Sequence, residues 1–345
     1  MAELILEDVC KTFRNQTAVD HLSLTIPDGA FCALLGPSGC GKTTTLRMIA
    51  GLEHLTSGRL TMNGMVLDDG RVAVAPEKRR MSMVFQSYAL WPHMTVIENV
   101  AYPLKVQGLP SPQAQKAARK MLEIVDMRGY ENRKVQELSG GQRQRVALAR
   151  CLVAEPEVVL LDEPLANLDR HLRATMEESF REFHRETGAT FVFVTHDQAE
   201  AMALATHVAV MHQGGLVQWG TPESLYQQPE TSWLAQFIGK GSVINLPVNT
   251  QSDRLLKNQD FALTASTIQQ PITQQPVLIR PEHIHITNTG TPAQVTDCVF
   301  LGERYLLTLR FADDQQSVSC YHHTALPQGS LVNIEIEQGW RVDVA

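Results

Sequence analysis

The segment Gly36–Thr43, which reads GPSGCGKT, restricts the possible folds of this chain more than any other feature. It follows the continuous apolar run of residues 30–35 and precedes residues 43–50, whose spacing predicts a helix. Glycines let the backbone of such a loop wrap so that its N–H groups point at phosphate oxygens. The N-terminus of the following helix adds a favourable dipole. A strand, a Gly-rich loop and a helix in this order predict a phosphate-binding loop in an α/β fold, because a chance glycine turn would lack this context.

The polar side chains of this loop suit a nucleoside triphosphate. Lys42 supplies a positive charge for the β and γ phosphates, and the hydroxyl of Thr43 can bind Mg²⁺. We therefore expect the whole loop and the next residue to contact nucleotide: Gly36, Pro37, Ser38, Gly39, Cys40, Gly41, Lys42, Thr43 and Thr44.

A second motif, VVLLDEP, ends in an acidic pair and occupies residues 158–164. Its apolar run predicts a buried strand that ends at Asp162 and Glu163, and ligands bind at the carboxyl ends of strands in open α/β sheets. Asp162 suits a carboxylate partner of Mg²⁺, and Glu163 is placed to orient or deprotonate an attacking water. Alone, such a pair could equally cap a helix. Beside a phosphate loop it predicts phosphoryl chemistry.

The rest of the first 239 residues alternates strand-like and helical patterns. Short apolar, β-branched runs at residues 158–161 and 191–194 predict parallel strands buried on both faces. Residues 4–9 and 22–26 alternate with period two, which predicts a half-buried antiparallel region. Helical periodicity predicts two longer helices, at residues 111–126 and 170–186.

Charge, cysteine content and hydropathy narrow the classes of function that we expect for the chain. A formal net charge of −7 provides no basic field for nucleic acid or an anionic bilayer. The six cysteines are scattered without a CxxC pair, so we expect neither a disulfide framework nor a zinc site. The sequence begins without a signal-peptide pattern, and no apolar run approaches the ~18 to 20 residues that span a bilayer. We therefore expect any membrane work to be done through partners.

A third motif, LSGGQRQRVALAR, covers residues 138–150. A Ser-Gly-Gly turn that opens a helix is a second anion site, and one chain needs two such sites if two chains sandwich the nucleotide. Here the sequence resembles the ATPase subunits of ABC transporters, whose signature reads LSGGQ. The resemblance implies that Ser139, Gly140, Gly141 and Gln142 contact the nucleotide held by a second copy.

Other residues extend the resemblance. Gln86, in VFQSYALWPHMTVIENV, is similar to the glutamine that reaches Mg²⁺ and the attacking water and couples to the membrane subunit. His196, in VTHDQAEAM, resembles the switch histidine that contacts the γ-phosphate. Phe13 matches the aromatic residue that stacks on adenine. The segment LANLD resembles the D-loop and ends in Asp169, but Ala166 stands where many relatives have serine, which puts one cross-dimer contact in doubt.

The pattern changes after Gly239, where short strand-like pieces replace helical periodicity. The sequences IRPEHIHI (residues 279–286) and VFLGERYLLTLRF (residues 299–311) resemble the OB-like, or TOBE, accessory domain of certain ABC importers. The expected architecture is thus an α/β P-loop NTPase domain of the ABC type, with antiparallel β and helical subdomains, over residues 1–239. A small all-β OB-like domain follows over residues 240–345.

The resemblance implies an import ATPase that uses ATP and Mg²⁺, forms a homodimer, and works with two integral-membrane permease subunits and, indirectly, a solute-binding protein. Its expected location is the cytoplasmic face of the inner membrane, bound peripherally. The segments 240–246 and 68–96 look most like the ferric iron branch, with polyamine, phosphonate, sugar or oxyanion import as alternatives. A non-transport ABC ATPase would typically have tandem cassettes or a coiled-coil insertion, and this sequence shows neither. We expect no nucleic-acid binding, because residues 241–345 carry six Lys and Arg against ten Asp and Glu.

Overall fold

A computed structural model describes most of the chain as two compact units, residues 1–222 and 223–345. The residues whose structure is described are 2–166, 170–248, 254–261, 273–312 and 316–343. Each unit has its own sheets and its own hydrophobic core.

A six-stranded sheet in the order β10-β9-β3-β8-β7-β6 forms the centre of the first unit. The five strands from β9 to β6 are parallel, and β10 pairs antiparallel with β9 at one edge. Every residue of the three middle strands is buried, as a parallel sheet covered on both faces requires. The strands are β3 (Phe31–Leu35), β6 (Met81–Val84), β7 (Val158–Asp162), β8 (Thr190–Thr195), β9 (His207–His212) and β10 (Gly215–Gly220).

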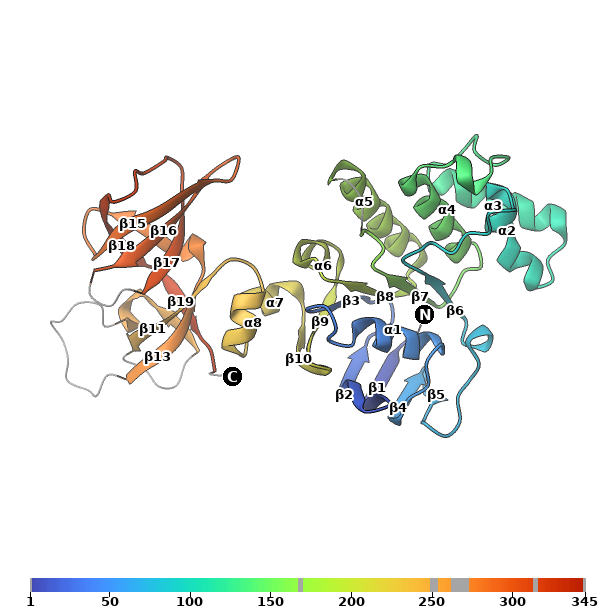
Figure 1. Ribbon diagram of the computed structural model, residues 1–345, viewed down its shortest axis with the longest axis horizontal. Helices are drawn as coiled ribbons and strands as arrows, with labels where there is room; N and C mark the ends of the chain where they lie inside the picture. Colours follow the sequence, from blue (N-terminus) through green and yellow to red (C-terminus); the bar gives the residue numbers. More distant parts are fainter. Residues whose placement is uncertain (1, 167–169, 249–253, 262–272, 313–315, 344–345) are drawn as a thin grey trace. The chain divides into compact units, whose positions relative to one another are not determined.

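A four-stranded antiparallel sheet, in the order β2-β1-β4-β5, lies on one side of the central sheet, with α1 between them (Figure 1). Its apolar residues share one core with α1 and with the near face of the central sheet. The strands are β1 (Leu4–Phe13), β2 (Gln16–Ile26), β4 (Ser57–Met62) and β5 (Met65–Asp68).

Helices cover the other side and extend beyond the sheet. Figure 1 shows α5 and α6 on the side of the central sheet opposite α1, and α2, α3 and α4 grouped beyond its β6 edge. The capping box of Thr95 and Glu98 starts α2, whereas α4 starts at the cap Ser139. The helices of this unit are α1 (Lys42–Ala50), α2 (Val96–Val106), α3 (Ser111–Ile124), α4 (Gly140–Leu152), α5 (Arg170–Thr187) and α6 (Gln198–Leu204), with short 3₁₀ turns η1 (Pro76–Lys78) and η2 (Val135–Glu137).

A buried arginine ties α1 to the antiparallel sheet. Arg79 has no exposed surface, and its guanidinium donates to the carbonyl oxygens of Met48 and Ile49, both at 2.8 Å, at the end of α1. Burial lowers the pKa of Arg79, while the carboxylate of Asp68, 4.0 Å away, raises it. A Cβ on Gly51 would lie 2.6 Å from the Arg79 Nε, so the helix end needs glycine there.

The second unit is almost entirely β. Two antiparallel sheets, β11-β13-β19-β12 and β14-β18-β15-β16-β17, share one apolar core, and α8 packs on β11 and β13. Its elements are α7 (Pro222–Gln227), α8 (Ser232–Phe237), β11 (Ser242–Val248), β12 (Leu255–Lys257), η3 (Asn258–Asp260), β13 (Thr273–Ile279), η4 (Pro281–His283), β14 (Ile284–Thr287), β15 (Thr291–Phe300), β16 (Tyr305–Phe311), β17 (Ser317–His322), β18 (Leu331–Ile336) and β19 (Gln338–Arg341).

The expected fold class is confirmed: a parallel α/β layer with antiparallel and helical additions is followed by a small all-β unit. The predicted strands β3, β7 and β8 and the helices α3 and α5 are present within a few residues of their expected bounds. Residue contacts group α7 and α8 with the β unit. The predicted domain boundary between residues 239 and 240 stays a prediction.

Candidate active site

The phosphate loop connects the carboxyl end of β3 to the start of α1. The Lys42 side chain is 6% exposed and bends back into the loop, where its Nζ donates to the carbonyl oxygens of Gly36 at 2.7 Å and Pro37 at 2.8 Å. The Cys40 Sγ lies 3.8 Å from the same Nζ. The loop therefore holds a buried ammonium group on its inner side, where an anion would meet it.

The loop can take this shape because of its glycines. Gly41 has φ 100°, and a Cβ there would lie 2.4 Å from the Ala18 carbonyl oxygen of β2. Gly39 has φ 81°, and a Cβ added to it would meet no neighbouring atom of the described residues within 4 Å, so its side of the loop is open. Ser38 is exposed beside it, whereas Thr44 is half-buried in the first turn of α1.

The hydroxyl of Thr43 and the carboxylate of Asp162 meet across the loop. Thr43 Oγ1 donates to Asp162 Oδ1 at 3.2 Å, which joins α1 to the end of β7. Burial raises the pKa of Asp162, and the Thr43 hydrogen bond and the Arg47 charge lower it. A hydroxyl beside a carboxylate is an oxygen donor set of the kind that Mg²⁺ prefers. The residues present therefore fit the expected ion.

Glu163 is the meeting point of the other predicted catalytic residues. Its Oε2 accepts a hydrogen bond from Gln86 Nε2 at 3.1 Å, and its Oε1 lies 3.3 Å from His196 Nδ1. Glu163 has φ 48°, a left-handed conformation that is uncommon for a residue with a Cβ, and its N–H donates to the Val194 carbonyl of β8. This backbone turn directs the carboxylate toward Gln86 and His196, which follow β6 and β8 respectively.

A partly buried hydrogen-bond network, which the sequence did not predict, holds the residues on either side of His196, Thr195 and Asp197. Thr195 Oγ1 donates to Glu200 at 2.6 Å and accepts from the Asp197 N–H at 3.0 Å, and Arg173 from α5 pairs with Asp197 at 2.9 Å. Burial raises the pKa of Glu200. Asp197 also caps α6, so the spacing Asp-x-x-Glu at a helix start was the available sequence signal.

The Ser-Gly-Gly turn lies at the start of α4. Ser139 Oγ accepts from the Gln142 N–H at 3.3 Å, and Gln142 Oε1 accepts from the Ser139 N–H at 3.0 Å. Among the described residues, these hydrogen bonds stay within the start of α4, so the turn is not bonded to the Thr43–Asp162 pair. Ser139 and Gly140 are exposed at the helix start, whereas Gly141 is buried. Ser139 and Gly140 are therefore the part of the turn that a second molecule can reach.

Phe13 ends β1 with 42% of its surface exposed, as an aromatic platform for a base would be. The Lys11 ammonium lies 4.7 Å from the centre of its ring. Asp169 lies outside the described residues. The assignment of nucleotide and Mg²⁺ contacts to individual residues stays a prediction.

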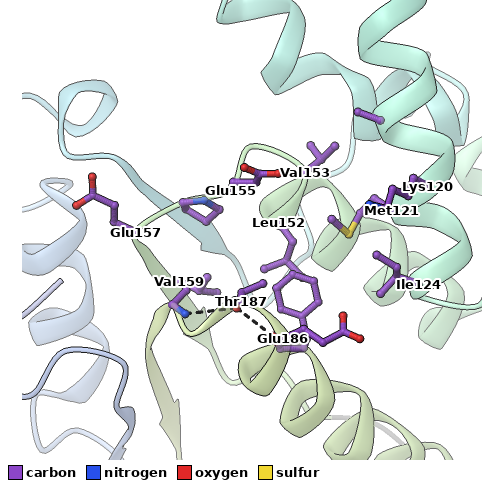
Figure 2. A pocket seen from close by; sticks show the side chains of 14 residues that line it. Lys120, Met121, Ile124, Leu152, Val153, Glu155, Glu157, Val159, Glu186 and Thr187 are labelled. Atoms are coloured by element: carbon purple, nitrogen blue, oxygen red, sulfur yellow. Dashed lines mark hydrogen bonds between the residues drawn. The ribbon is translucent and has the colours of Figure 1, made fainter. Parts of the chain in front are cut away.

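A cavity of about 470 Å³ lies elsewhere in the first unit (Figure 2). Its lining comes from α3, the end of α4, the start of β7 and the end of α5, and includes Met121, Leu152, Val159 and Thr187. Among the described residues that line the cavity, only Val159, at the start of β7, belongs to one of the motifs above. We assign the chemistry to the motif residues, because β7 carries Asp162 at its end and the cavity lies at its start.

Two family models match the chain. The model described as ABC transporter covers residues 19–166, and the model described as TOBE domain covers residues 277–340.

Curated relatives match over most of the chain. The Fe(3+) ions import ATP-binding protein FbpC of Vibrio cholerae is 40% identical over 339 residues, which cover 95% of each chain. The spermidine/putrescine import ATP-binding protein PotA of Thermobifida fusca is 43% identical over 328 residues, 91% of this chain and 84% of that protein.

Solved structures match about two thirds of the chain. A dimeric structure of the ATP-binding cassette MJ0796, bound to ADP and Pi, aligns with a TM-score of 0.58 and 29% identity, covering 64% of this chain and 98% of that one. The cbiO1 protein of Clostridium perfringens aligns with a TM-score of 0.60 and 28% identity, covering 65% of this chain and 90% of that one.

Proposed function

The chain belongs to the ATP-binding subunits of ABC importers, and from this premise we propose that it hydrolyses ATP to drive ferric iron uptake through two membrane permease subunits. The observation that carries the proposal of ATP hydrolysis is the contact of Glu163 with both Gln86 and His196. Glu163 is next in sequence to Asp162, which pairs with Thr43. Binding without hydrolysis would need the loop and the Mg²⁺ donors but not this second cluster.

The loop residues account for nucleotide binding. Lys42 exchanges its carbonyl partners for phosphate oxygens, the loop N–H groups contact the phosphates, and Phe13 stacks on the base. Thr43 and Asp162, with Gln86, would hold Mg²⁺, which neutralises charge on the phosphates when it is bound. Among the described residues of the loop, Lys42 alone carries a full positive charge.

Glu163 is the proposed general base. Gln86 and His196 hold its carboxylate from two sides, which fixes the direction in which it accepts a proton from water. His196 is exposed, so its ring can also reach a phosphate that enters from outside the loop.

A second copy of the chain completes the site in this proposal. The N–H groups of the turn Ser139–Gly141 suit a phosphate, and the turn's side-chain hydrogen bonds to described residues stay within its own helix start. A homodimer in which each turn faces the partner's loop would use them. The MJ0796 cassette is dimeric in its structure with ADP and Pi, which supports the dimer in this proposal.

Among the described residues, no helix is long and apolar enough to cross a membrane. In this proposal the transported ion passes through separate permease subunits, with this chain bound to their cytoplasmic face at the inner membrane. A solute-binding protein would supply the ion to the permease. The C-terminal domain, residues 240–345, would serve dimer contacts or regulation, and no role for nucleic acid is proposed. A variant truncated after Gly239 should still bind ATP.

Ferric iron is the favoured solute because several relatives named for Fe(3+) import are about 40% identical over most of the chain. Polyamine import is a second candidate, because PotA proteins reach 40% and 43% identity. Uptake of radiolabelled ferric iron and of spermidine should be measured in cells lacking the gene and complemented by wild type or Lys42→Ala. We expect wild type alone to restore iron uptake. Restored spermidine uptake without iron uptake would reject the iron assignment.

A further inference from the structure

The segment after Gln86 has an unusual backbone. Tyr88 has φ 63° and Ala89 has φ 45°, so two consecutive residues with a Cβ are left-handed. This conformation is disfavoured for such residues and persists where the surroundings enforce it. A loop of this kind needs an external clamp to keep one shape.

Arg150, near the end of α4, contacts both carbonyl groups of this turn. Its Nη1 donates to the Ala89 oxygen at 2.7 Å, and its Nη2 donates to the Tyr88 oxygen at 2.8 Å. The guanidinium also lies over the Trp91 ring, 4.7 Å from its centre. Arg150 is half-buried. A planar fork can bond two carbonyls and stack on an aromatic ring at once, which a lysine cannot do.

The other end of the segment is fixed by α2. The buried Asn99 amide accepts from the Trp91 N–H at 2.9 Å and donates to the carbonyls of Trp91 at 3.1 Å and Thr95 at 3.0 Å. The Trp91 ring lies 4.3 Å from the Tyr102 ring. The residue that Arg150 stacks on is therefore itself held in place.

The helix that carries Arg150 begins at the Ser139 turn. The helix α4 runs without a break from Gly140 to Leu152, so the turn and the clamp belong to one rigid rod. At the other side of the clamp, Gln86 donates to Glu163. The proposed partner-facing turn is thus connected to the proposed base through α4, Arg150 and the short segment that leads back to Gln86.

We propose that Arg150 is a positioning residue, which holds the left-handed turn at Tyr88 and Ala89 and thereby aligns Gln86 with Glu163 and couples the loop to α4. This inference rests on the proposed ATPase function. Among the described residues, Arg150 is bonded to Tyr88 and Ala89 and not to Lys42 or Phe13. We therefore expect its loss to slow the chemical step, in which Gln86 and Glu163 act, and to leave the contacts of Lys42 and Phe13 with the nucleotide in place.

The test compares Arg150→Lys with Arg145→Lys, a matched change on the same helix. Arg145 pairs with Asp126 at 3.1 Å and does not contact the turn. Arg150→Lys should lower kcat by about ten- to a hundredfold, as loss of alignment does, and leave KM for ATP within about twofold. Amide hydrogen exchange of residues 86–91 in the nucleotide-free protein should accelerate at least about tenfold. Arg145→Lys should change neither quantity.

A rescue separates positioning from a general effect on α4. Glycine adopts the left-handed conformation readily. The double variant Arg150→Lys with Ala89→Gly should therefore have a kcat at least about threefold higher than that of Arg150→Lys alone. Unchanged exchange in Arg150→Lys, an equal loss in kcat for Arg145→Lys, or no rescue by Ala89→Gly would overturn the proposal. If wild type itself hydrolyses no ATP, the proposed function fails, and the exchange rates still decide whether Arg150 holds the turn.

Discussion

Replacing Arg79 by methionine should destabilise the first unit by about 3–5 kcal/mol, because it removes a buried, charged hydrogen-bond donor from four carbonyl groups. The Arg79 guanidinium donates to Met48 and Ile49 at 2.8 Å, to Val74 at 2.9 Å and to Leu67 at 3.3 Å. Hydrogen bonds to charged groups contribute about 1.5–3 kcal/mol each, and water would replace some of them. Methionine keeps much of the side-chain bulk, so a cavity contributes little.

The neighbouring Arg80 provides the control. Its side chain is 75% exposed and forms one ion pair with Glu157 at 2.9 Å. Such surface pairs contribute about 0–1 kcal/mol, so Arg80→Met should be nearly neutral. The two variants have the same composition and differ only in which arginine is lost.

Urea unfolding followed by circular dichroism measures both variants against wild type. Because Arg79 caps the end of the helix that carries Lys42, its replacement should also weaken ATP binding, measured by titration calorimetry. A loss below about 1 kcal/mol for Arg79→Met, or equal losses for both variants, would refute the reasoning.

Two further outcomes concern the site, and a third concerns the buried Cys151. Lys42→Ala should lower ATP turnover about 100-fold or more, measured with purified protein, and near wild-type turnover would reject the phosphate-loop assignment. Phe13→Ala should raise KM for ATP about fivefold or more while Phe13→Tyr stays close to wild type, and equal KM values for all three would exclude base stacking. Burial raises the pKa of Cys151 to about 12, so at pH ~8 a thiol reagent should label the half-buried Cys10 before Cys151; equally fast labelling would contradict the burial.

Local sequence patterns were enough to predict a part of the site where its chemistry and its backbone geometry require the same residue types. The loop Gly36–Thr43 and the strand ending at Asp162 could be predicted because glycines, a cation and carboxylates have few other uses at that spacing. The family resemblance also implied that Gln86 and His196 act at one site, and the structure brings both to Glu163.

Other features depend on contacts between distant residues. Arg79 lies in the run Lys78–Arg80, which by pattern alone resembles a solvated surface, and only the tertiary structure separates the buried arginine from its exposed neighbour. The pairing of Arg150 with Tyr88 and Ala89 joins residues that are 62 and 61 positions apart, so it leaves no periodic signal in the sequence. The left-handed turn occurs without glycine, so no residue type in the segment indicates it.

Trapping of a dimer by Glu163→Gln tests the central claim most directly. Glutamine keeps the size of the side chain but removes its basicity, so ATP binding should survive while hydrolysis falls by about 10²- to 10⁴-fold. The unhydrolysed nucleotide should then hold two chains together through the Ser139 turn of each, and size-exclusion chromatography with MgATP should show a dimer. Adding Ser139→Arg should abolish that dimer. Normal turnover by Glu163→Gln would contradict the assigned base, and a dimer that persists with Ser139→Arg would contradict the nucleotide sandwich.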